Sequence, residues 1–265
     1  MGLQCMVGVE MIQEFYYGTS WKWPIQYLPR VMITASYLDA RKKKVEIEKP
    51  YMVDRGVGKE FSSLTKNPII SVHRYAELLR RQQPQIASTF DYPCEPDLRK
   101  KRGYTCIEAQ SMTNENTRIL LKEFPDAIFN VLQGWTVSEY LENLDMIKED
   151  GLLTERLGIG SICRRGQLSK IVEIIRVIKR NVPSWVKLHG FGVKIDVLKT
   201  YAKYDLYSAD SQAWAIAAFG RYANNGKGQT GWSIKEKLPY LLSYIDRIES
   251  LIAPHPEQTL LEVLE

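Results

Sequence analysis

Acidic and amide side chains follow short apolar runs at four places along the chain. The runs YMV, IASTF, IFNVL and DLYSA lead directly into Asp54, Asp91, Gln133 with Gly134, and Asp210. Strands of a parallel barrel are buried on both faces, so they read as apolar runs, and functional groups lie where they end. Three carboxylates and an amide that meet there would form a pocket for a nucleobase and for proton transfer. The pattern therefore predicts acid/base chemistry at a base-binding site.

Strands and helices must alternate to bring these residues together. From residue 30 onward they do, which predicts an α/β fold, a single-domain (β/α)₈ TIM-type barrel. Strands are expected at Val31–Ser36, Tyr51–Val53, Ile86–Phe90, Ala127–Leu132, Arg156–Ile159, Val186–His189 and Asp205–Tyr207, with an eighth only weakly signalled. Apolar residues at three- and four-residue spacing predict covering helices at Tyr75–Arg81, Asn114–Glu123, Val137–Glu149 and Leu168–Arg180.

The chain divides into three segments. Residues 1–29 are rich in aromatic side chains and are expected to close one end of the barrel or to pack on its rim. Residues 30–232 form the barrel, and residues 233–265 are expected to form C-terminal helices, a pair that ends after Pro254. No repeat or linker suggests a second domain.

The composition indicates a globular protein with a mildly basic surface. Of 265 residues, 45% are hydrophobic and 25% charged, and the formal charge is +5. Basic residues gather at 41–44, 80–81, 99–102 and 164–165. Each cluster could be a solvated face, since Lys and Arg are mostly exposed. Several on one rim would instead favour a phosphate backbone as the partner.

Cysteine and histidine usage argues against a metal site. The four cysteines, Cys5, Cys94, Cys106 and Cys163, form no CxxC pair, and the chain has three histidines. We therefore expect no metal and no cofactor. No long apolar span is present, so we expect no membrane contact and a reduced, cytoplasmic protein, in the host cytoplasm if a phage encodes it.

Six motifs follow one another in a distinctive order: VDRG (53–56), TFDYPCEP (89–96), VLQG (131–134), LGIGS (157–161), LHGFG (188–192) and YSADSQAW (207–214). Their order resembles the tRNA-guanine transglycosylase superfamily over about residues 30–220. The chain is most similar to the DNA 7-deazaguanine transglycosylases of phage and bacterial DNA-modification systems. The resemblance implies base exchange: an aspartate attacks the sugar, guanine leaves, and a 7-deazaguanine such as preQ0, the cyano-bearing precursor of queuosine, replaces it.

The resemblance assigns two catalytic aspartates. Asp210 matches the family nucleophile, and its rival Asp205 is better explained as the start of a strand. Asp54 matches the general acid/base, which would protonate the leaving guanine and deprotonate the incoming base. The family usually has Ser-Gly-Gly-Phe after this aspartate, whereas this chain has Arg-Gly-Val-Gly at 55–58. Asp54 could instead serve as a turn or helix cap.

The resemblance also assigns the residues that bind the base. Asp91 and Gln133, with Gly134, match the residues that read the purine edge, where a carboxylate can accept from N1–H and the 2-amino group. Gly160 and Ser161 match positions whose backbone amides contact the base carbonyl, although either could be a plain turn.

Five further residues are weaker candidates. Tyr92, Trp135 and Trp214 could stack on the base, or they could be rim and core aromatics. Glu95 and His189 could support the site from behind, or they could be a helix-start carboxylate and a satisfied turn histidine.

Several functions remain open at this stage. DNA is the expected partner, with tRNA as the alternative; related tRNA enzymes carry a CxCxxC zinc site late in the chain, and here no cysteine follows Cys163. Companion modification proteins are a further expected kind of partner. A glycosidase or nucleosidase on a similar barrel would use paired carboxylates with water. A catalytically silent nucleic-acid-binding barrel would need the basic clusters alone.

Overall fold

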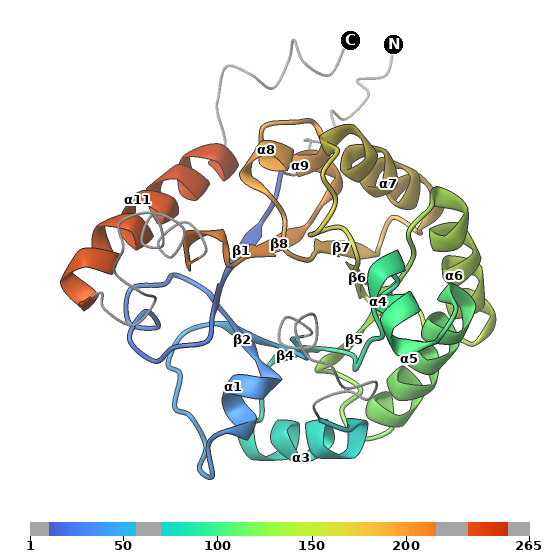
Figure 1. Cartoon of the computed structure of the whole chain (residues 1–265), viewed down its shortest axis with the longest axis horizontal. Helices are drawn as coiled ribbons and strands as arrows, with labels where there is room; N and C mark the ends of the chain where they lie inside the picture. The colour runs from blue at the N-terminus through green and yellow to red at the C-terminus, as the bar shows by residue number, and fades with distance from the viewer. Residues whose placement is uncertain (1–10, 57–69, 216–232, 254–265) are drawn as a thin grey trace, which may run out of the picture.

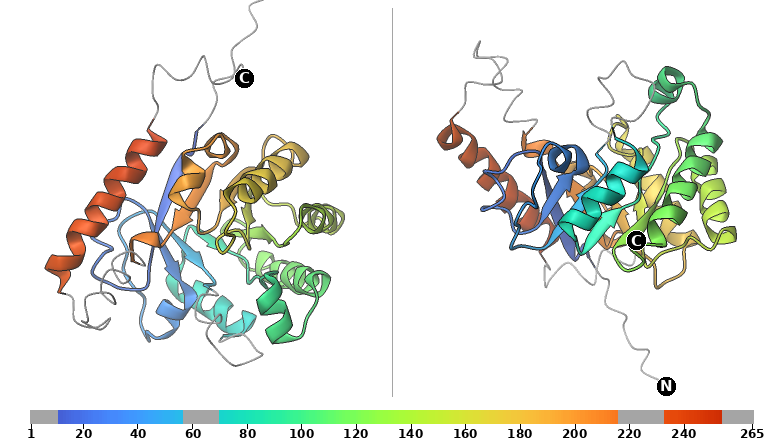
Figure 2. Two further views of the ribbon diagram at one scale, coloured as in Figure 1. Left: turned by 45° about the horizontal axis from the view of Figure 1, so that its top comes forward. Right: turned by 90° about the horizontal axis from the view of Figure 1, so that it is seen from below.

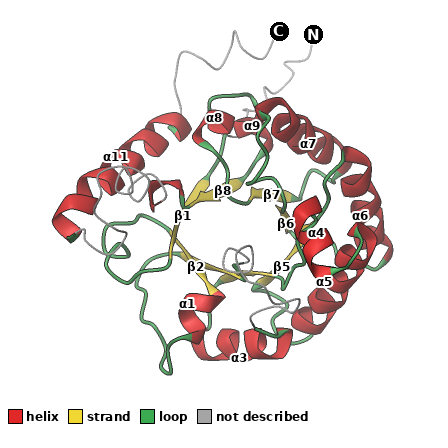
Figure 3. Cartoon of the chain, viewed as in Figure 1, coloured by secondary structure: helices red, strands yellow, loops and turns green. Residues whose placement is uncertain are grey.

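Eight parallel strands close into a barrel in the computed structural model, which describes residues 11–56, 70–215 and 233–253. Each strand pairs with the next, and β1 pairs with β8. The inner ring (Figure 3) consists of β1 (Glu14–Thr19), β2 (Val31–Thr34), β3 (Tyr51–Asp54), β4 (Ile86–Ser88), β5 (Ile128–Leu132), β6 (Arg156–Ile159), β7 (Lys187–Gly190) and β8 (Ser208–Ser211). The predicted (β/α)₈ barrel is confirmed.

Helices form an outer ring around the strands (Figure 1). They are α1 (Ala35–Asp39), α3 (Val72–Gln82), α4 (Pro96–Arg102), α5 (Cys106–Leu121), α6 (Val137–Glu149), α7 (Leu168–Asn181), α8 (Ile195–Leu198), α9 (Ala202–Asp205) and α11 (Ile234–Ile252). Figure 2 shows α4 at one end of the barrel, beyond the longer helices. Among the described helices, none has the length and apolarity needed to cross a membrane.

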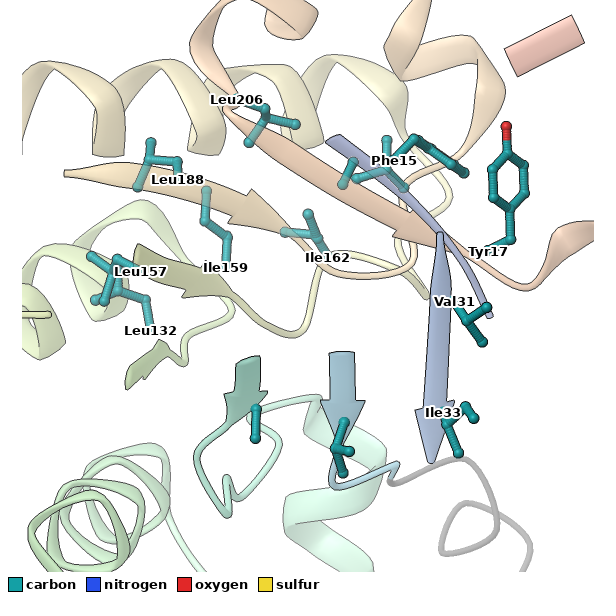
Figure 4. Close-up of a cluster of buried hydrophobic side chains, with 14 of the residues drawn as sticks. Phe15, Tyr17, Val31, Ile33, Leu132, Leu157, Ile159, Ile162, Leu188 and Leu206 are labelled. Atoms are coloured by element: carbon teal, nitrogen blue, oxygen red, sulfur yellow. The ribbon is translucent and has the colours of Figure 1, made fainter. Parts of the chain in front are cut away.

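The strand side chains alternate between two buried layers, because successive residues of a strand face opposite sides. Phe15, Tyr17, Leu157 and Ile159 belong to the large core between strands and helices (Figure 4). A separate apolar cluster fills the inside of the barrel with Tyr16, Met32, Met52, Phe129 and Val131. The inward positions of β7 and β8 are polar instead, and these positions carry the candidate site.

Two strands differ from the sequence prediction. The segment 1–29 was expected to close one end of the barrel or to pack on its rim, yet residues 14–19 form β1, a strand of the barrel wall that joins β2 to β8. The last strand was expected at 205–207, but β8 begins at Ser208. Asp205 ends α9 and lies 4.0 Å from Arg176, so it belongs to a helix end rather than to a strand start.

The C-terminal segment supplies a helix that packs on the barrel. Tyr17 Oη of β1 donates to Glu249 Oε1 of α11 at 2.7 Å, and Leu241 and Ile248 of α11 are fully buried. The expected second helix, after Pro254, lies outside the described residues.

The four basic clusters lie at two ends of the barrel. Residues 99–102 belong to α4 and residues 164–165 follow β6, so both lie at the carboxyl-terminal ends of the strands. Residues 41–44 lead from α1 back to β3, and residues 80–81 end α3, so both lie towards the opposite end. Two of the four clusters can therefore contribute to one binding surface.

Candidate active site

The three carboxylates and the amide predicted from the strand ends gather at one end of the barrel. Asp54 ends β3, Asp91 and Gln133 follow β4 and β5, and Asp210 lies in β8. Burial raises the pKa of Asp54 from 3.8 to about 7, and the charges of Asp91 and Asp210 add to this rise. Their influence on Asp54 shows that the three carboxylates share one site.

Asp54 is held by its neighbour on β4. Ser88 Oγ donates to Asp54 Oδ1 at 3.1 Å and accepts the N–H of Arg55 at 3.3 Å. The buried Arg55 guanidinium lies 4.3 Å from the centre of the Phe90 ring. Because the pKa of Asp54 is raised to about 7, this carboxyl can carry or release a proton near neutral pH.

Asp210 is 2% exposed and is held through one oxygen. The N–H of Gly192 donates to Asp210 Oδ1 at 3.0 Å, and His189 Nε2 lies 3.3 Å from the same oxygen. Gly192 has a φ of +60°, and a Cβ there would lie 2.5 Å from Cys163 Cβ, so glycine is needed for this N–H to reach the carboxylate. Burial raises the pKa of Asp210 to about 7, which the Gly192 N–H partly offsets.

A hydrogen-bonded chain connects Asp91 with Glu95. Gln133 Nε2 donates to Asp91 Oδ2 at 2.5 Å, and Gln133 Oε1 lies 2.7 Å from Ser161 Oγ. Ser161 Oγ lies 2.8 Å from Glu95 Oε2 and accepts the N–H of Cys94 at 2.9 Å.

The Ser161 hydroxyl links the two ends of this chain. Its Oγ lies within hydrogen-bond distance of both Gln133 Oε1 and Glu95 Oε2, and its single proton can go to only one of them. Burial raises the pKa of Glu95. Gln133 turns Oε1 towards Ser161 and donates from Nε2 to Asp91. The chain fixes which way the Gln133 amide points.

The backbone N–H of Gly160 is placed differently from the family expectation. The N–H of Gly160 donates to Leu132 O at 2.9 Å, so it completes the ladder between β5 and β6 instead of facing a base. A Cβ on Gly160 would lie 2.3 Å from Gln133 Nε2. Ser161 adopts a φ of +55° and turns its hydroxyl towards Gln133. Both residues act on the Gln133 side chain.

The turn after Gly134 carries Trp135, one of the possible stacking residues, in a contact with Arg165 that the sequence did not indicate. The buried guanidinium of Arg165 lies 4.1 Å from the Trp135 ring centre and donates to Trp135 O at 2.6 Å. A cavity of about 630 Å³ opens beside this turn, between the loops that follow β5 and β6, and its lining includes Trp135, Arg164 and Lys170. The sequence showed residues 164–165 only as a basic pair.

The other two possible stacking residues lie among aromatic side chains. Trp214 is 1% exposed, packs against Trp21 and Trp23, and donates its Nε1–H to Gly18 O at 3.0 Å. It is a core residue and does not line the site. Tyr92 is partly buried, with its ring edge-on to Phe90.

Sequence reasoning also missed three residues that contact the predicted ones. They are Ser88 beside Asp54, and Ser208 and Arg156 below His189. All three are polar residues at inward-facing strand positions. The sequence alone does not show which positions face inward, because that depends on the strand register. Within the described residues, no group of three His, Cys, Asp or Glu side chains is arranged to hold a metal.

Comparison with known families now adds to this geometry. A family model described as DeoxyPurine in DNA protein A, DpdA, matches residues 49–261, which is most of the chain. The chain belongs to the DpdA family. This family is one of DNA guanine transglycosylases, which implies a DNA-modifying enzyme with DNA and a deazaguanine base as its substrates. No curated protein matches the chain.

The DpdA match includes every strand from β3 to β8. Asp54, Asp91, Gln133 and Asp210 therefore all fall within the part of the chain that defines its family.

Proposed function

We propose that this protein exchanges guanine in DNA for a 7-deazaguanine through a covalent intermediate on Asp210. The observation that carries the proposal is the buried Asp210 carboxylate at the end of β8, held through Oδ1 by Gly192 and facing a second carboxyl, Asp54, whose pKa is near neutrality. A nucleophile and a separate proton carrier are what a double displacement at a sugar carbon needs.

The exchange has two steps. An Asp210 oxygen forms a bond to C1′ of the deoxyguanosine as the bond from C1′ to N9 breaks, and protonated Asp54 supplies the proton that the leaving guanine takes. Asp54 then removes the N9 proton of the incoming 7-deazaguanine, whose N9 attacks C1′ and releases Asp210. The C1′ configuration is inverted twice and therefore retained, and no water is consumed.

Asp91 and Gln133 are proposed to select the base. The Asp91 carboxylate would accept from N1–H and the 2-amino group of a guanine-like base, and the Gln133 N–H₂ would donate to its acceptors. Adenine has no N1–H and no 2-amino group to donate to the Asp91 carboxylate, which discriminates against it. A 7-deazaguanine such as preQ0 has the same edge as guanine, so one pocket accepts both.

The turn at Trp135 supports DNA as the polymer. A guanine must leave the base stack before Asp210 can reach its sugar, at a cost of a few kcal/mol. The cavity beside Trp135 offers an aromatic ring for a flanking base, and Arg164 and Lys170 line it for a phosphate. Contacts of this kind would offset the cost of flipping.

The experiment that tests the function is incorporation. Purified protein is mixed with guanine-containing DNA or with tRNA and a panel of 7-deazaguanines, and the nucleosides of each polymer are identified by mass spectrometry. A deazaguanine deoxynucleoside in DNA supports the proposal. Modification of tRNA alone would reject DNA as the substrate, and abasic sites that form without any added base would indicate a glycosidase.

Replacing Gly160 by Ala is expected to impair exchange with little effect on folding. The new Cβ would collide with Gln133 Nε2, which is held in place by Asp91 and Ser161 and so cannot yield without losing its orientation. We expect a fall in kcat/KM of about 100-fold, the loss typical of a misplaced recognition group. Asp145→Asn, on the exposed surface of α6 and away from the site, is the control. Equal activity of the two variants would refute this role of Gly160.

DNA binding is expected to depend on the basic residues at the carboxyl-terminal ends of the strands. Replacing Lys100, Lys101 and Lys170 together by Ala should weaken binding about 10-fold or more and reduce the slope of log K against log salt by about 2 to 3. The matched control replaces the basic run at 42–44, at the other end of the barrel. Fluorescence anisotropy across a salt series measures the DNA affinity and its salt dependence for each variant. An affinity of the wild type that does not change with salt would contradict a phosphate-binding surface.

A further inference from the structure

A row of inward-facing polar side chains lies beneath Asp210 and leads to the opposite end of the barrel. Arg156 Nη2 pairs with Glu14 Oε2 at 2.9 Å, and Arg156 Nη1 donates to Ser208 Oγ at 2.7 Å. Ser208 Oγ lies 2.9 Å from His189 Nδ1, and His189 Nε2 lies 3.3 Å from Asp210 Oδ1. The row therefore joins an ion pair at the amino-terminal ends of β1 and β6 to the carboxylate at the site.

Strand register makes this row possible. Ser208 of β8 lies directly opposite Glu14 of β1 and His189 of β7. Asp210 is two residues beyond Ser208, so both face the barrel interior. Arg156 starts β6 two residues before Gly158, the register partner of His189.

One assignment satisfies every polar group along the row. A guanidinium can only donate, so Ser208 Oγ accepts from Arg156. If His189 Nδ1–H also donated to Ser208, the buried Ser208 proton would have no acceptor among the described residues, so Ser208 is assigned as the donor to Nδ1. A neutral imidazole that accepts at Nδ1 carries its proton on Nε2. His189 then donates to Asp210 Oδ1, beside the Gly192 N–H. Among the described residues, none donates to Oδ2, so Oδ2 is the oxygen that can attack.

His189 is held as a neutral ring in one orientation. It is fully buried, and burial lowers its pKa to about 3. Three groups that can carry charge lie near it: Arg156, which lowers this pKa further, Glu14, which opposes that effect, and Asp210, whose Oδ1 lies 3.3 Å from Nε2. Aromatic rings pack around the imidazole edge-on: Tyr16 from β1, Phe129 from β5 and Phe191 from the loop after β7. A change of tautomer is therefore the main freedom that the ring retains.

We propose that Arg156 is a positioning residue that acts through Ser208 to fix the Nε2–H tautomer of His189, so that the imidazole donates to Asp210 Oδ1, favours the ionised carboxyl over the protonated one, and leaves Oδ2 presented to the sugar. The opposite tautomer would turn the Nε2 lone pair towards Asp210 Oδ1, which is repulsive unless Asp210 carries the proton. A protonated Asp210 cannot form the bond to C1′. The catalytic part of this inference rests on the proposed function, but the tautomer does not.

The tautomer is measured by nitrogen NMR of protein labelled with ¹⁵N-histidine, with His189→Gln used to assign the His189 signals. We expect His189 in the wild type to be a single Nε2–H tautomer. Arg156→Met should give a mixture or the Nδ1–H form, and Lys187→Met should change nothing. Lys187 is the matched control because it lies at the same end of the barrel, paired with Glu155 and outside the row. An Nδ1–H wild type, or an unchanged tautomer in Arg156→Met, would overturn the proposal.

Kinetics tests the catalytic consequence. Arg156→Met and Ser208→Ala should each lower kcat about 10-fold or more with the KM for DNA unchanged, and the double variant should be no worse than either, because both break one connection. The paired variant Arg156→Met with Glu14→Gln removes the carboxylate that Arg156→Met would leave unpaired, and it should show the same loss in kcat while folding better. A lost tautomer with full kcat would reject the positioning role. If the wild type shows the Nε2–H tautomer of His189 but no exchange activity, the proposed function is rejected. The hydrogen bonds assigned along the row would still stand.

Discussion

Replacing Asp210 by Asn is expected to abolish base exchange, with a loss of at least about 10⁴-fold. An amide cannot form the covalent bond to C1′, yet it has the shape of the carboxylate and can still accept the Gly192 N–H. DNA binding should therefore persist. Single-turnover incorporation followed by mass spectrometry measures the loss. Asp205→Asn, at the end of α9, is the matched control and should retain full activity; the reverse result would make Asp205 the nucleophile.

The same substitution should stabilise the fold in a pH-dependent way. The pKa of Asp210 is raised by burial from 3.8 to about 7, so above pH 7 an ionised carboxylate is held in a site that favours the neutral form. A rise of this size corresponds to about 4 kcal/mol of destabilisation. Because a buried amide also loses water contacts, we expect a net gain of about 2 kcal/mol for Asp210→Asn at pH 8.

The sign of this effect distinguishes it from a packing effect. As pH falls from about 7 towards 3.8, the folded protein takes up the Asp210 proton before the unfolded chain does, so the wild type gains stability. The advantage of Asp210→Asn should shrink over this range, vanish at about pH 5.5 and reverse below it, where the wild type is the more stable protein. Denaturant unfolding at pH 8 and at pH 5 measures it, and a constant difference would mean that Asp210 is not the titrating group.

The second large effect concerns Asp54. Exchange requires Asp210 ionised and Asp54 protonated, and both groups have a pKa of about 7. The pH profile of kcat/KM should therefore be a narrow bell centred near pH 7. Because Asp54 and Asp210 interact, the apparent pKa values of its acid and alkaline limbs describe the two carboxyls together. Asp54→Asn should lower the rate about 10² to 10⁴-fold and remove the alkaline limb, because no proton is then lost as pH rises.

An exposed aspartate serves as the control for Asp54. Asp145 lies on the outer surface of α6 near Lys148, and Asp145→Asn should leave the profile unchanged. An alkaline limb that survives in Asp54→Asn would assign the general acid to another group.

Most of the barrel was readable from the sequence because its outward strand positions are apolar. The strands β2 to β7 coincide with apolar runs, and α6 has its predicted bounds. β8 was placed about three residues early because its sequence is SADS, in which Ser208 and Asp210 fill inward positions with polar groups. β1 was assigned to the rim because aromatic residues fit a rim as well as a strand, and only its pairing with β8 shows that it closes the barrel.

Site residues that directly follow a strand could be predicted from the sequence. Residues that act on the site through other side chains could not. Asp54, Asp91, Gln133 and Asp210 are found at the strand ends as expected. Arg156, however, acts at a distance through two other side chains, and no local pattern signals such a row. Glu95 and Ser161 were predicted near the site, but their hold on Gln133 follows only from the hydrogen-bond geometry.

The central claim, a covalent bond between Asp210 and the sugar of DNA, is tested most directly by trapping it. Wild-type protein is mixed with guanine-containing DNA, quenched under denaturing conditions and digested, and the peptide that carries a deoxyribosyl ester is sequenced by mass spectrometry. The proposed mechanism predicts the ester on Asp210 and none in Asp210→Asn. An ester on Asp54 or Asp91, or full exchange by Asp210→Asn, would contradict it.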